Sequence, residues 1–125
     1  MKLPSEAELL RIFIGEADKF EGKPLFEAIV QAARQQELAG ATVLRGLLGF
    51  GAHSRVHSAK ILRLSEDLPM VIEIVDTPEK IEAFLPELDH MMDEGLVTLE
   101  KVNVIVYRHQ KEDTSSAGAE EKGSS

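Results

Sequence analysis

The hydrophobic residues of this chain change their spacing in a fixed order, and that order limits the fold more than any other feature. Residues 9–15 alternate between two apolar sets, which predicts a strand, because every second side chain of a strand lies on the same face. Apolar residues at helical intervals follow Pro24, a residue that suits the first turn of a helix. Gly40 is expected to end this helix.

The middle of the chain is rich in strand-forming residues. Thr42 to Leu48 predicts a second strand and Ser58 to Leu64 a third. Met70 to Val75 is also β-rich, and Pro69 before it is expected to bend the chain or split the third strand.

A second helix and a last strand complete the pattern. Thr77 is expected to cap the helix, with Pro78 in its first position. Pro86 lies within the apolar stripe and is expected to kink the helix or restart it. Gly95 should end it, and Leu96 to Tyr107 should hold the last strand.

The order βαββαβ predicts an α+β fold of the ferredoxin-like type, an antiparallel sheet with two helices on one face. The length fits a single domain, which we place at residues 1–109. Residues 110–125 are polar and hold no large apolar side chain, so this tail is expected to be disordered.

Two of the strand segments carry apolar residues in both alternating sets. They are Thr42 to Leu48 and Met70 to Val75. Both faces of the sheet therefore favour burial, whereas two helices cover only one face. Self-association is the simplest way to bury the other face.

The formal net charge of -8 argues against general binding to nucleic acid, which needs a basic surface. The chain has no cysteine, which excludes disulfides and thiol catalysis. No apolar run reaches membrane-spanning length, and the N-terminus lacks the core of a signal peptide. We therefore expect a cytoplasmic protein that does not insert into a membrane.

One segment of this acidic chain holds no acidic residue at all. Residues 38–65 contain four basic side chains, two histidines, and three glycines within six positions, Gly46, Gly49 and Gly51. Glycines let backbone N–H groups turn toward an anion without a Cβ in the way. The segment therefore predicts a site for a small anion, of which phosphate fits best.

Simpler interpretations stand beside this one. The same glycines suit a β-bulge or a loop root. His53 and His57 are spaced to share a metal ion, but two solvated loop histidines are the simpler interpretation. No catalytic constellation is evident in the sequence, so an enzyme is the less favoured class.

Five segments together resemble the uncharacterised family of small PII-like proteins of bacteria and archaea. The similarity covers about residues 8–108 and is carried by Arg11–Glu16, Gly22–Leu25, Ala39–Gly46, Gly49–Ser54 and Glu94–Lys101. The wider superfamily includes the PII nitrogen-regulatory proteins and the CutA proteins, which are trimers of ferredoxin-like subunits. The resemblance therefore implies a homotrimer.

The resemblance also implies a nucleotide site, because PII proteins bind ATP or ADP in clefts between subunits. Thr42 matches the threonine near their adenine, and Gly49-Phe50-Gly51 matches the root of their long loop. Lys101 matches the lysine of their second nucleotide loop, although Thr98-Leu99-Glu100 stands where they carry Gly-Asp-Gly. We expect nucleotide binding by six residues, Thr42, Gly49, Gly51, His53, Arg55 and Lys101.

The function implied is that of a cytoplasmic signalling protein. An anionic effector, expected to be ATP, ADP or AMP, would bind between subunits and order the loop Ala52–Ser58. That loop would contact a target protein, such as a membrane channel, a transporter or an enzyme. The alternatives are a CutA-like trimer that binds a divalent metal through His53 and His57, and a structural adaptor with no ligand.

Overall fold

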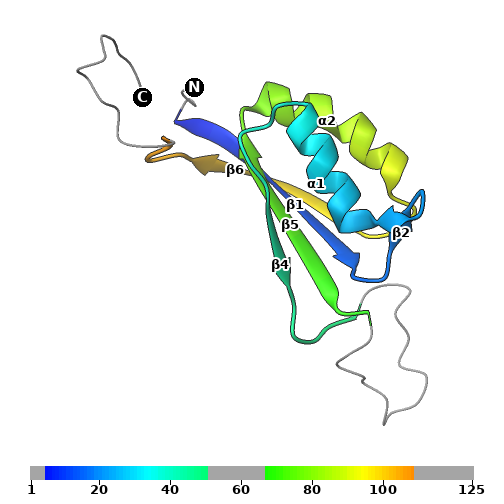
Figure 1. Ribbon diagram of the computed structural model, residues 1–125. Coiled ribbons are helices and arrows are strands. Elements are labelled where there is room, and N and C mark those ends of the chain that lie inside the picture. Colours follow the sequence, from blue (N-terminus) through cyan, green and yellow to red (C-terminus); the bar gives the residue numbers. More distant parts are fainter. Residues whose placement is uncertain (1–4, 51–66, 109–125) are drawn as a thin grey trace.

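The computed structural model describes residues 5–50 and 67–108, which form a four-stranded antiparallel sheet with two helices (Figure 1). The sheet has the order β4-β5-β1-β6, and a separate two-stranded hairpin joins β2 to β3. The strands are β1 Glu6–Gly15, β2 Lys19–Phe20, β3 Lys23–Pro24, β4 Thr42–Arg45, β5 Pro69–Asp76 and β6 Leu96–Asn103. The helices are α1 Leu25–Gln35 and α2 Pro78–Met91.

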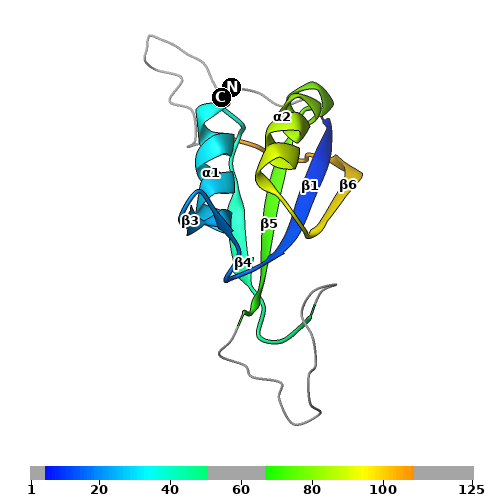
Figure 2. The same ribbon diagram turned by 90° about the vertical axis from the view of Figure 1, so that its right-hand side faces the viewer.

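Both helices lie on the same face of the sheet (Figure 2). With the strand order above, this is the ferredoxin-like arrangement, so the predicted α+β fold class is confirmed. The central strand β1 pairs with two strands that are distant in sequence. Leu10, for example, faces Ile74 on β5 and Leu99 on β6.

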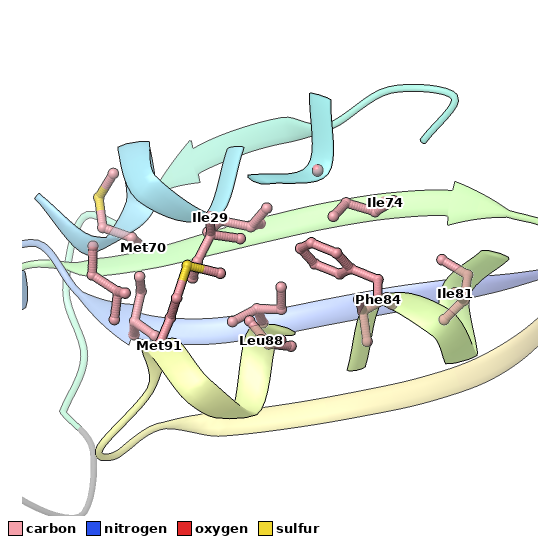
Figure 3. Close-up of a cluster of buried hydrophobic side chains, with 13 residues drawn as sticks. Ile29, Met70, Ile74, Ile81, Phe84, Leu88 and Met91 are labelled. Atoms are coloured by element: carbon pink, nitrogen blue, oxygen red, sulfur yellow. The ribbon is translucent and has the colours of Figure 1, made fainter. Parts of the chain in front are cut away.

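The core fills the space between the helices and the sheet (Figure 3). On the sheet side, one alternating set of each central strand is buried, because side chains of the same parity share a face. The buried apolar residues of the helices are Leu25, Ile29, Ala33, Ile81, Phe84, Leu88 and Met91. In Figure 3 the labelled side chains of α2 point toward those of β5 and α1.

The first helix ends earlier than the prediction that Gly40 stops it. Its last residue is Gln35, and Glu37 takes a left-handed conformation with φ 62. The amide of Leu38 donates to the Ala33 carbonyl and that of Glu37 to the Arg34 carbonyl, both at 3.0 Å. These two bonds form a Schellman motif, which satisfies the helix end without a glycine.

The second helix begins as predicted, with Thr77 as its cap. The Thr77 hydroxyl accepts a hydrogen bond from the Lys80 amide at 3.2 Å, and Pro78 takes the first helical position. Pro86 lies inside the helix, which continues to Met91 as one element. Of the two predicted effects of Pro86, a kink or a restart, the restart is therefore wrong.

Two strands are shorter than predicted. β4 ends at Arg45 instead of Leu48. The Gly46 amide still donates to the Pro69 carbonyl, but Pro69, the first residue of β5, has no N–H with which to continue the ladder. β6 ends at Asn103 instead of Tyr107. The predicted strand Ser58–Leu64 lies outside the described residues.

Candidate functional site

The face of the sheet opposite the helices, here called the open face, has a charged cluster beside an apolar row. Arg11 on β1 pairs with Glu73 on β5, with its Nε 2.9 Å from the carboxylate, and its Nη1 lies 3.6 Å from Glu100 on β6. Cross-strand partners share a face, so the register places an apolar row beside this cluster, formed by Phe13, Leu44, Val71 and Leu96.

The two edge strands leave much of their apolar surface in solvent. Leu44 on β4 is 49% exposed and Leu96 on β6 is 56% exposed. Val97 and Leu99 on the other face of β6 are also exposed, because the helices do not cover this edge. Both faces of the sheet therefore offer apolar residues for burial.

The predicted glycine segment begins at a close contact with Pro69. A Cβ at position 46 would lie 2.6 Å from the Cγ of Pro69, and one at position 49 would lie 3.1 Å from it. Neither Gly46 nor Gly49 has a positive φ. Both glycines let the backbone pass close to the proline ring. This agrees with the simpler interpretation, in which the glycines serve a bulge or a loop root.

Three of the six predicted nucleotide-binding residues lie in the described part of the chain, and two of them, Thr42 and Lys101, lie on opposite edges of the sheet. Thr42 is exposed on the open face of β4, opposite Glu73, and Gly49 lies against Pro69. Lys101 lies on β6 opposite Glu8, on the helix-covered face. Gly51, His53 and Arg55 lie outside the described residues.

The distance between Thr42 and Lys101 follows from the strand order. β4 and β6 are the two edges of the sheet, so three strand spacings, about 14 Å, separate them. A single small ligand cannot contact both residues in one protomer.

Lys101 lines a pocket of about 420 Å³ between the start of α2 and the ends of β1 and β6. The pocket is formed by Glu6, Ala7, Glu8, Pro78, Glu82, Lys101, Val102 and Asn103. Three of these side chains are acidic and one is basic. Glu8 was not predicted as a site residue, although the alternation of Leu10, Ile12 and Ile14 extends back to it and indicates burial.

Within residues 5–50 and 67–108, no group of three or more His, Cys, Asp or Glu side chains could hold a metal ion. His53 and His57, the histidines of the metal hypothesis, lie outside these ranges. No helix in the described ranges has the length and apolar character needed to cross a membrane.

Comparison with known protein families gives a match over most of the chain. Residues 7–104 match the family DUF190, described as "Uncharacterized ACR, COG1993". A UPF0166 protein of Aquifex aeolicus is 43% identical over 98 residues, which cover 78% of this chain and 92% of that protein. The UPF0166 protein MJ1524 of Methanocaldococcus jannaschii is 36% identical over 100 residues, which cover 79% and 92%.

Solved structures with the same fold are more distant in sequence. A PII-like protein of Thermus thermophilus has a TM-score of 0.57 at 18% identity, covering 84% of this chain and 94% of that one. CPII of Thiomonas intermedia K12, a PII-like protein solved with ADP, AMP and bicarbonate, has a TM-score of 0.52 at 18% identity, covering 83% and 99%. At these identities the likeness concerns the fold. The chain therefore belongs to the DUF190 family, whose relatives are the UPF0166 proteins, and has the PII-like fold.

Proposed function

We propose that this protein is a PII-like regulator rather than an enzyme, and that it acts as a homotrimer. An adenine nucleotide, ATP, ADP or AMP, binds between subunits and changes the loop Ala52–Ser58 that a target protein contacts. The target is a membrane channel, a transporter or an enzyme. Support comes from the PII-like fold and from a neighbour of that fold, CPII, which was solved with ADP and AMP.

The observation that carries the proposal is the position of Thr42 and Lys101 on opposite edges of the sheet. A ligand that uses both residues must lie where the β4 edge of one subunit meets the β6 edge of the next. Two different edges that meet in this way form a heterologous contact, which closes into a ring when the rotation between subunits allows it.

The apolar surface agrees with this arrangement. Leu44 and Leu96 are each about half exposed, and they lie on the two edge strands that the ring would join. Burial of such residues is the main favourable term in association. The Arg11 cluster lies beside the row that joins them and would fix the register of the contact through its charges.

The loop Ala52–Ser58 would respond to the ligand through its root. Its N-terminal root is fixed by the Gly46 amide on the Pro69 carbonyl. A phosphate near Gly49 and Gly51 would place negative charge beside His53 and Arg55 and so favour one arrangement of the loop. In a structural adaptor with no ligand, the loop would not change its arrangement in this way.

Calorimetric titration of the protein with ATP, ADP and AMP tests the nucleotide site. Lys101→Ala is expected to weaken binding about tenfold, or about 1.4 kcal/mol, for a lost charge-assisted contact. Lys19→Ala is the matched control, because Lys19 is also an exposed strand lysine but lies on the β2–β3 hairpin. Equal affinity in wild type and Lys101→Ala would remove Lys101 from the site.

Hydrogen exchange tests the effect on the loop. We expect fast exchange of the amides of Ala52–Ser58 without nucleotide and slower exchange at saturation. Exchange that is slow from the start, or equally fast at saturation, would favour the structural adaptor instead.

A further inference from the structure

Glu8 is an acidic side chain buried on the helix-covered face without a full set of partners. The residue is only 8% exposed, and its Oε1 atom is enclosed yet accepts no hydrogen bond from the described residues. An ionised carboxylate offers only acceptors, and burial without a donor is unfavourable. The position therefore favours an added N–H donor.

The neighbour of Glu8 on β5 makes an added N–H donor more favourable still. Glu8 pairs directly with Asp76, which is fully buried. The carboxylate of Asp76 already accepts from the Ala39 amide at 2.8 Å and from the Thr77 amide at 2.6 Å. Asp76 thus brings Glu8 a second negative charge and no donor, and like charges directly opposite in a ladder are unfavourable.

The neighbour of Glu8 on β6 is Lys101, the only basic side chain that lines the pocket. No ion pair joins the two side chains within the part of the chain that the structure describes, and Lys101 is exposed. The buried acid therefore keeps its unpaired oxygen although a lysine lies opposite.

The pocket beside Glu8 offers room for a ligand and an excess of negative charge. Its volume is about 420 Å³, and three acidic residues, Glu6, Glu8 and Glu82, line it together with one basic residue, Lys101. These acids do not form a group that could hold a metal ion in the described residues. An organic cation with N–H donors fits both the charge and the unpaired acceptor.

We propose that this pocket binds a small organic cation, a primary ammonium or a guanidinium compound. Its N–H groups donate to Glu8, and Glu6 and Glu82 at the pocket balance its charge. Lys101 competes with this ligand for Glu8. The nucleotide proposal uses the same lysine, but there Lys101 attracts the ligand.

The test is a titration of the isotope-labelled full chain followed by NMR. Agmatine carries a guanidinium and an ammonium group, putrescine carries only ammonium groups, and butanediol is a neutral control of similar length. We expect saturable shifts of the amides of Ala7, Glu8 and Val102 with at least one of the two amines and none with butanediol. No saturable shift at millimolar amine, or equal shifts with butanediol, would overturn the proposal.

Substitutions locate the ligand within the pocket. Glu8→Gln keeps the shape and is expected to weaken amine binding about tenfold, as for a lost charge-assisted contact. Glu27→Gln, which removes an exposed acid from α1, is the matched control and should have no effect. If Glu8→Gln does not fold, Glu82→Gln serves instead, with a loss of several-fold expected.

Lys101→Met separates this proposal from the nucleotide site. It should raise or preserve amine affinity here, whereas it should lower nucleotide affinity if Lys101 contacts phosphate. A fall in amine affinity in Lys101→Met would contradict the cation site. A large coupling between Glu8 and Lys101 in a double-mutant cycle without ligand would also contradict it, since Lys101 would then be the missing partner.

Discussion

The amide of Gly46 donates to the carbonyl oxygen of Pro69 at 2.7 Å, and a Cβ at position 46 would lie 2.6 Å from the Cγ of the same proline. The loop root therefore depends on a glycine directly after β4 and a proline at the start of β5. The ring of Pro69 cannot rotate away, because it is part of the backbone of β5.

Gly46→Ala is accordingly expected to lower the free energy of unfolding by about 1–3 kcal/mol, the usual effect of overpacking. Gly40→Ala is the matched control, because a Cβ there would meet nothing within 4 Å. Urea denaturation of the two variants measures the difference. Equal stability would show that the backbone around Pro69 yields easily.

Arg11→Ala tests whether the open face is buried between subunits. The loss of Arg11 leaves Glu73 without its partner at 2.9 Å. On a solvated surface such a loss costs about 0.2–1 kcal/mol. In a buried interface it costs about 3–5 kcal/mol, because an uncompensated charge remains.

We expect the larger effect of Arg11→Ala, together with dissociation of the assembly, measured by unfolding at several protein concentrations. Arg45→Ala is the control, since its pair with Glu16 is longer, at 3.4 Å, and its side chain is 60% exposed. Similar small effects of both substitutions would place the open face in solvent.

Leu44→Glu tests the contact between subunits directly. A charge at this half-exposed position on the open face should give a folded monomer, because a buried interface does not tolerate an unpaired charge. Light scattering should give about three times the chain mass of 13.8 kDa for wild type and for the conservative control Leu44→Met. For Leu44→Glu it should give the mass of a single chain. A wild-type monomer would exclude the proposed ring.

Asp76→Ala tests the connection between α1 and β4. Asp76 is fully buried and accepts hydrogen bonds from the amides of Ala39 and Thr77. Loss of both acceptors should cost about 1–3 kcal/mol or more in thermal or urea unfolding. Glu79→Ala, at an exposed site in the first turn of α2, should cost less. A gain in stability would instead mean that repulsion between Asp76 and Glu8 dominates.

The periodicity of the sequence was sufficient to predict the fold, because burial in this chain follows the apolar alternation closely. Leu10, Ile12 and Ile14 are buried on β1 while Leu9, Arg11 and Phe13 remain partly exposed. The open face could also be predicted, since the second apolar set of β5 has no helix to cover it. Element ends were less predictable, because they depend on tertiary contacts.

Two of these ends show the limit in physical terms. Glycine is the usual residue at a left-handed helix end, but Glu37 takes that conformation here and two backbone hydrogen bonds support it. β4 stops at Arg45 because its next partner, Pro69, lies 23 positions from Gly46 in sequence and has no N–H to continue the ladder. Neither contact is encoded in local propensity.

The candidate site was less predictable than the fold. Thr42 and Lys101 were chosen from a family resemblance, and whether they share a ligand depends on a second subunit. Glu8 was missed because acidic residues are rarely buried. An acidic residue next to an apolar alternation is therefore easily taken to lie outside the buried part of the strand. Its pairing opposite Asp76 depends on a strand register that no local pattern reveals.

The central position of β1 affects how the chain folds over time. Ile12 pairs with Ile72 on one side and with Val97 on the other, so neither partner is close in sequence. Closing such long loops requires entropy to be lost before any sheet contact forms. During synthesis, β1 therefore stays unpaired until β5 and β6 have been made. We expect this sheet to form slowly and largely after translation. The helices are able to form first.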